Sequence, residues 1–170
     1  CEQALTDLGA AGCQVDAYRV PFDPQRLWRI WLAHRHLMVG GQLHGLVSNP
    51  ETRKLVKPAV IWEVEGMDGM TAHQVFQATE ERSAWYQTVL AMFQDVDFLA
   101  VPTAQVFPFD AELDWPKAIA GRAMDTYHRW METVTPWTLA GCPVISVPVG
   151  FGADRPAARR PGGAATGPRL

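Results

Sequence analysis

The sequence has 170 residues, of which 48% are hydrophobic and 19% are charged, so it can form one hydrophobic core of ordinary size. A net charge of −3 argues against nucleic acid and anionic membranes as partners, because both attract basic proteins. No apolar run approaches the ~20 residues that cross a bilayer, and we expect a soluble, cytoplasmic protein.

The cysteines support a reducing compartment. Cys1, Cys13 and Cys142 are odd in number, lie far apart and form no CxxC pair. This pattern suits neither a disulfide framework nor a zinc site. We therefore expect no metal and no cofactor.

The first predicted elements are a helix and a strand. Residues 2–11 resemble the end of a helix that Gly12 stops, and the alternating residues 13–20 predict a strand. Because the first residue is not methionine and the sequence opens within a helical pattern, we expect the natural chain to begin further upstream.

Two longer helices follow. Residues 25–47 predict a helix with one buried stripe, which Gly40 and Gly41 weaken or end; its apolar positions are Leu27, Ile30, Trp31, Leu37 and Met38. Thr71 and Gln74 have the spacing of a capping box, which predicts a long helix from there to Phe93.

The second half of the chain predicts strands around a crossover. Residues 96–104 suit a buried strand that Pro102 ends, and residues 142–150 suit a short β-branched strand. Between them we expect a loop and then a helix from Gly121 that carries Met124, Tyr127 and Met131 on one side. This order of elements indicates the α/β class, with a partial mixed sheet flanked by helices and a helix-rich composition.

The composition changes after Phe151. Residues 152–170 consist almost entirely of Gly, Ala, Pro and Arg, which bury too little apolar surface to offset the entropy of ordering. We therefore expect a folded domain over residues 1–151 and a disordered tail over 152–170. We consider two interpretations of this segment: an arginine-rich interaction tail, or a frame-shifted or truncated end.

Two segments resemble a known family. "DFLAVPTAQVFPFDAELDWP" has the aspartate-led strand that ends in Pro-Thr, and "GRAMDTYHRWMETVTPWTLAGCPVISVPVGF" has an aromatic-rich segment before Leu-Ala-Gly-x-Pro-x-Ile-Ser-Val-Pro. Together they look like the carboxy-terminal part of the amidase signature family, over about residues 1–151. The resemblance implies hydrolysis of a carboxamide C–N bond by a Ser, cis-Ser, Lys triad on a mixed sheet.

The catalytic segment of that family has no counterpart in this sequence. A serine needs a base to become a nucleophile, and a lysine acts as a base only when burial keeps it neutral. The serines have no glycine neighbour and the lysines lie in no plausible catalytic loop; they are Ser48, Ser83, Ser146, Lys54, Lys57 and Lys117. We assign no catalytic residue and expect the triad upstream, so that this chain alone is inactive.

The resemblance also suggests substrate-binding residues. Arg82 matches the position where related amidotransferase subunits hold a substrate carboxylate, although a salt bridge would also explain it. Thr138 and Gly141 fall in the loop that lines the family's pocket, where Thr138 replaces a frequent asparagine. Aromatic side chains suit either a substrate wall or core packing; they are Trp115, Tyr127, Trp130 and Trp137.

Other constellations favour structural roles. Asp110, Glu112 and Asp114 lack the glycine and the bidentate glutamate of a calcium loop, and we interpret them as a solvated turn. His34 and His36 are two residues apart on a helix and point in different directions. A Ser-His-Asp set of Ser146, His128 and Asp125 can be drawn, but Ser146 lies within a predicted strand.

Two functional interpretations remain open. The chain is either part of an amidase that acts on a small-molecule amide, or a non-catalytic module or decayed relative that completes its sheet with a partner. Its aromatic content would suit a homodimer. Unpaired strand edges would make the isolated chain prone to aggregation.

Overall fold

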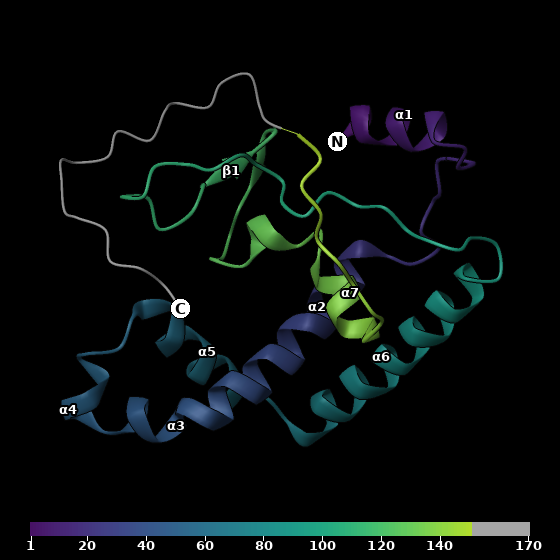
Figure 1. Cartoon of the computed structure of the whole chain (residues 1–170). Coiled ribbons are helices and arrows are strands. Elements are labelled where there is room, and N and C mark those ends of the chain that lie inside the picture. Colours follow the sequence, from purple (N-terminus) through teal and green to yellow (C-terminus); the bar gives the residue numbers. More distant parts are fainter. Residues whose placement is uncertain (151–170) are drawn as a thin grey trace, which may run out of the picture. The chain divides into compact units, whose positions relative to one another are not determined.

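A computed structural model describes residues 1–150, which form two compact units: residues 1–16 with 147–150, and residues 17–146 (Figure 1). The tail predicted over residues 152–170 lies outside the described residues. In the first unit, helix α1 spans Glu2–Ala10, and Gly12 follows it with φ +99°, as expected for a helix that a glycine ends. The strand predicted over residues 13–20 is wrong: this segment is irregular, because alternation alone provides no ladder partner.

The second unit begins with a long helical run. Helix α2 spans Pro24–Arg35, a π-helical turn η1 spans His36–Gly40, and helix α3 spans Gly41–Ser48. Asp23 caps the run by accepting hydrogen bonds from the backbone of Gln25 and Arg26 at 3.0 and 3.2 Å. Gly40 is the last residue of the π-turn and Gly41 the first of α3, so the two glycines do not end the helical run. Gly40 is needed there because a Cβ would lie 2.6 Å from Cβ of Met67.

Two helices after this run were not predicted from the sequence. Helix α4 spans Pro50–Arg53 and helix α5 spans Pro58–Asp68, each with a proline in its first turn, where no backbone donor is lost. In α5 the fully buried residues are the neighbours Glu63 and Val64. Because apolar residues occur around the whole helix, its sequence shows no clear stripe.

Helix α6 confirms the prediction from the capping box. It spans Ala72–Met92; the Thr71 N–H donates to Gln74 Oε1 at 2.8 Å and the Gln74 N–H to Thr71 Oγ1 at 3.2 Å. Helices α2 and α6 pack against each other and against α7, which spans Thr135–Ala140 (Figure 1). Their contact forms the core, made of Leu27, Ile30, Trp85, Val89, Met92, Leu139 and Ala140.

The helix predicted from Gly121 is wrong. Strands β1, Ala118–Ile119, and β2, Arg122–Ala123, form an antiparallel hairpin there. Its turn residues Ala120 and Gly121 have φ of 48° and 80°, as a type I′ turn requires.

Between the hairpin and α7, only a 3₁₀ turn, η2, at Arg129–Met131 is helical. The Arg129 carbonyl accepts a hydrogen bond from the Gln105 side chain at 2.9 Å, which competes with α-helical pairing. The aromatic and β-branched residues before it are also weak helix formers.

The helix-rich character is confirmed, and helices with a small sheet agree with the α/β class. Among residues 1–150, however, the sheet consists of the hairpin alone, and the segments predicted as strands at 96–104 and 142–150 are irregular. Phe98, Val144 and Ile145 are 88%, 73% and 83% exposed. An apolar strand needs neighbouring strands for its backbone and side chains, and no described segment provides them. None of the described helices is long and apolar enough to cross a membrane.

Candidate functional site

The predicted substrate residue Arg82 lies on α6 beside the end of α7. Its Nε atom donates a hydrogen bond to the carbonyl of Leu139 at 2.9 Å. No ion pair of Arg82 occurs among the described residues, so the salt bridge offered as an alternative is not what holds it. Arg82, Leu139 and Ala140 border a shallow hollow of about 350 Å³ with Ser83, Tyr86 and Gln87. The guanidinium therefore presents donors at the edge of a surface depression.

Three further predicted residues belong to α7 and its end. Trp137 packs at 5.8 Å between ring centroids against Trp85 of α6. The Thr138 hydroxyl donates to the Val134 carbonyl at 3.3 Å, within its own helix. Gly141 ends the helix in the left-handed region with φ 70°, where a side chain would be strained. The structure thus gathers Arg82, Trp137, Thr138 and Gly141 at the junction of α6 and α7.

Tyr127 belongs to a different group. It is 40% exposed and contacts Trp115 and His128 edge-on, with ring centroids 6.3 and 5.1 Å apart. Trp130 instead contacts Phe109. The four aromatic residues considered as one substrate wall therefore fall into separate contacts, and only Trp137 joins the α6–α7 core.

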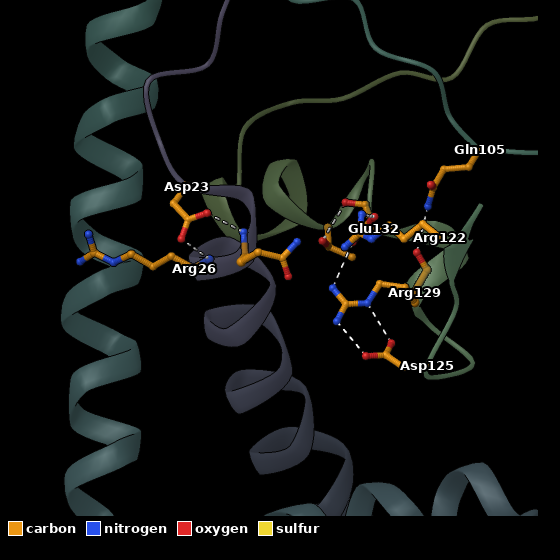
Figure 2. A network of polar contacts seen from close by, with 9 residues as sticks. Asp23, Arg26, Gln105, Arg122, Asp125, Arg129 and Glu132 are labelled. Atoms are coloured by element: carbon orange, nitrogen blue, oxygen red, sulfur yellow. Dashed lines mark hydrogen bonds and ion pairs between the residues drawn. The ribbon is translucent and has the colours of Figure 1, made fainter. Parts of the chain in front are cut away.

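Arg129 is at the centre of a polar network beside α2 (Figure 2). Its Nε and Nη2 donate to both carboxylate oxygens of Asp125 at 2.9 and 3.0 Å, and its Nη1 donates to Glu132 at 3.1 Å. Glu132 also pairs with Arg122 of β2. The Arg129 guanidinium lies 4.1 Å from the ring centroid of Trp28. A buried arginine thus fixes the 122–132 segment against α2.

A second polar cluster surrounds Glu63, which is only 2% exposed. Oε1 of Glu63 accepts a hydrogen bond from Arg35 Nε at 2.9 Å and lies 3.2 Å from His128 Nε2. Its Oε2 lies 3.0 Å from His36 Nδ1, close enough for an ion pair, although neither atom has a well-aligned hydrogen bond. The π-turn carries His36, and α5 accommodates it at Gly66, where a Cβ would lie 2.5 Å from the His36 ring.

The charges of this cluster follow from its geometry. Burial acts to raise the pKa of Glu63, but the approach of His36 and Arg35 outweighs burial, and the pKa is below its usual value of 4.5. Burial lowers the pKa of His128 below 6.5, and Arg35 and His36 add to the effect while Glu63 opposes it. A carboxylate beside a neutral His128 is therefore the favoured state near pH 7.

The sequence reasoning missed both Glu63 and Arg129. Glu63 stands inside the apolar run "AVIWEVEGM", and a carboxylate in such a run is a signal for a buried ion pair. Arg129 is followed three residues later by Glu132 and preceded four residues earlier by Asp125, a spacing that fits paired charges. Among residues 1–150, no group of three His, Cys, Asp or Glu side chains could hold a metal ion.

The serines and lysines do not come together. Ser83 donates to the Thr79 carbonyl within α6, and Ser146 lies 3.4 Å from the Thr103 hydroxyl. Within residues 1–150, no hydrogen bond joins a lysine to a serine. The drawn Ser-His-Asp set is likewise not assembled, since Asp125 binds Arg129 and His128 faces Glu63.

Another serine approaches a histidine on α3. Ser48 Oγ lies 3.2 Å from Nδ1 and 3.4 Å from Nε2 of His44, and His44 lies 3.5 Å from Asp68. Because Ser48 Oγ is almost equally far from both ring nitrogens, it is poorly placed to give its proton to either one. His44 and Asp68 are about half exposed, so nothing excludes water from them. We interpret this set as a surface contact between helices.

Comparison with known proteins identifies the family. The family model described as Amidase matches residues 1–167, nearly the whole chain. The chain therefore belongs to the amidase family, a class of hydrolases. Neither the curated proteins nor the solved structures contain a match to it.

Proposed function

We propose that the chain is the carboxy-terminal part of an amidase that hydrolyses a carboxamide C–N bond, with its Ser, cis-Ser and Lys residues on a segment upstream. The observation that carries this proposal is the uncovered apolar chain at 96–104 and 142–146 within an amidase family match. Phe98, Val144 and Ile145 are residue types that are common in a sheet interior, yet they face solvent. Strands from another segment of an amidase domain would cover them.

The junction of α6 and α7 supplies the substrate side in this proposal. Arg82 offers guanidinium donors beside the hollow, and the Leu-Ala-Gly-Cys-Pro segment typical of the family, residues 139–143, ends α7 and leads into the irregular chain. The upstream segment would supply the nucleophile, its base and the oxyanion donors. Three free cysteines support a cytoplasmic location for the whole enzyme.

One pair of experiments tests the proposal. The coding DNA upstream should continue in frame into a lysine and a Gly/Ser-rich run, and a start codon directly ahead of Cys1 would favour the non-catalytic module. In parallel, the purified 170-residue chain should hydrolyse no simple amide, whereas the extended chain should. Turnover by the short chain would overturn the assignment of the triad to the upstream segment.

Arg82 provides a sharper test in the extended enzyme. Arg82→Met keeps the aliphatic stem but removes the guanidinium, and should raise KM because substrate binding loses charged donors. Arg26→Met is the matched control, since Arg26 lies on α2 in a half-exposed pair with Glu81. Equal kinetics for the two variants would assign Arg82 a structural role.

A further inference from the structure

An aromatic cavity lies within the second unit, bordered by residues 18–22, α2, α6, residues 101–102, the 122–133 segment and α7. Its volume is about 650 Å³, within the range of small-molecule sites. Its aromatic lining consists of Tyr18, whose hydroxyl donates to Asp95 at 3.3 Å, and of Phe22, Trp28, Trp85 and Trp137. The structure thus forms an aromatic wall, but Trp137 is its one member from the group that the sequence suggested.

The aromatic lining is rigid. Trp85 is fully buried, and its indole N–H donates to the Pro136 carbonyl at 2.7 Å, so the polar end of the ring is already satisfied. Phe22 meets Trp85 edge-on at 5.4 Å between centroids. Trp28 is held between Trp31, at 5.1 Å, and the Arg129 guanidinium. Such fixed rings favour a planar aromatic ligand, because little side-chain entropy is lost on binding.

The polar part of the lining is small. Thr133 has a buried hydroxyl oxygen with no hydrogen-bond partner among the described residues. Glu132 and Arg122 pair with each other, as Figure 2 shows, and Arg19 is the remaining charged residue of the lining. The charges therefore sum to one positive, which disfavours a cationic ligand. A buried unsatisfied hydroxyl favours a ligand that brings a polar partner.

We propose that this cavity binds the aromatic group of a small amide that carries no positive charge, with the amide group close to Thr133. The inference rests on the proposed function for calling this ligand a substrate; the binding itself does not depend on it. The proposal selects aryl amides over aliphatic amides as the substrate class, a choice that the sequence left open. Aromatic rings beside one unpartnered hydroxyl would discriminate poorly among small aliphatic amides but well between these and aryl amides.

Direct binding to the purified 170-residue chain tests the proposal without catalysis. The probe is 2-naphthamide, followed by tryptophan fluorescence and by ligand-observed NMR, with acetamide and 2-naphthylmethylamine as comparisons. We expect saturable binding of naphthamide at least about tenfold tighter than of either comparison compound. Equal binding of all three, or none, would overturn the proposal.

Variants locate the binding. Val101 lines the cavity and is 44% exposed, so Val101→Trp should fill space without disturbing the core and weaken naphthamide binding at least about tenfold. Val144→Trp is the matched control, because Val144 is 73% exposed and outside the lining. Thr133→Val removes only the hydroxyl and should reduce the preference for naphthamide over naphthalene. Undiminished binding to Val101→Trp, with an unchanged unfolding midpoint, would contradict the site.

The two proposals fail separately. Naphthamide binding to the short chain together with an extended chain that hydrolyses no amide would overturn the proposed function and keep the cavity. Hydrolysis by the extended chain with no preference for aryl amides, and no binding by the short chain, would keep the function and overturn the cavity.

Discussion

Glu63 accepts a hydrogen bond from Arg35 at 2.9 Å although Glu63 is 2% exposed and Arg35 is 39% exposed. The pair therefore joins a fully buried carboxylate on α5 to a guanidinium that water still reaches on α2. The two histidines on the other sides of the carboxylate make Glu63 the common contact of α2, α5, the π-turn and the segment around His128.

Removing the charge of Glu63 should destabilise the chain strongly. We expect Glu63→Gln to lower the free energy of unfolding by about 3 kcal/mol, the low end for a broken buried pair because Arg35 keeps contact with water. Urea denaturation measures the change. Glu65→Gln is the control on the same helix: Glu65 is 59% exposed and pairs with Arg53, so its loss should stay below about 1 kcal/mol. Similar losses would show that burial of Glu63 has no energetic consequence.

Acid should destabilise the chain through His128 and Glu63. Both have pKa values below the usual ones, so the unfolded chain binds more protons, and stability falls as pH falls. The contribution of His128 is complete above pH 6.5 and decreases below it; that of Glu63 begins to decrease near pH 4.5. The charged side chains and the histidine that act on the His128 ring are Glu63, Arg35 and His36, and the titratable Tyr127 contacts the ring edge-on.

Denaturation midpoints between pH 7.5 and 5 test this dependence. The variant His128→Gln should flatten the curve in that range, since the neutral side chain cannot gain a proton. The variant His73→Gln replaces an exposed histidine at the start of α6 and should leave the curve unchanged. A wild-type midpoint that does not fall toward pH 5 would contradict the prediction.

Gly66 should tolerate no side chain. A Cβ there would lie 2.5 Å from the His36 ring, so Gly66→Ala must push His36 away from Glu63 and should cost about 1–3 kcal/mol. Gly45→Ala on α3 is the opposite case, because nothing lies within 4 Å of its Cβ position. It should stabilise by about 0.5–1 kcal/mol through helix propensity. Thermal and urea unfolding should therefore move in opposite directions for the two variants.

Arg129 should not be replaceable by lysine. The substitution Arg129→Lys loses the two-pronged contact with Asp125 and the planar contact with Trp28, and should cost about 2 kcal/mol of unfolding free energy. The control Arg122→Lys, at a guanidinium 45% exposed, should cost less than about 1 kcal/mol. An equal effect of the two substitutions would mean that burial of Arg129 contributes nothing.

Local signals in the sequence predicted some elements well. The capping box of Thr71 and Gln74 fixes the start of α6 through bonds three residues apart, and Gly12 follows α1 with positive φ. Both effects depend on neighbours along the chain. They can therefore be inferred without knowledge of the fold.

The failures share a different cause. Residues 13–20, 96–104 and 142–150 were predicted as strands from apolar alternation, yet a strand also needs a partner, and none occurs among residues 1–150. The helix expected after Gly121 is replaced by contacts of Gln105 and Arg129, which are distant in sequence.

The candidate site likewise has one part that the sequence could indicate and one part that it could not. Of the residues chosen by resemblance to the family, four lie at the junction of α6 and α7: Arg82, Trp137, Thr138 and Gly141. The fifth, Tyr127, lies in a separate aromatic group. The site assignment itself stays a prediction. The aromatic cavity could not be predicted from the sequence, because it forms through tertiary contacts between α2 and α6 that no local sequence pattern encodes.

The π-turn at His36–Gly40 sets the angular phase of the helical run. One extra residue in a turn shifts every later side chain by about 100° around the axis. Leu27 and Ile30 lie in the core with residues of α6 and α7, whereas α3, further along the same run, packs against α5. A one-residue deletion within 36–40 would keep the run helical but point the α3 side chains away from α5, so the length of this turn is constrained in addition to its residues His36 and Gly40.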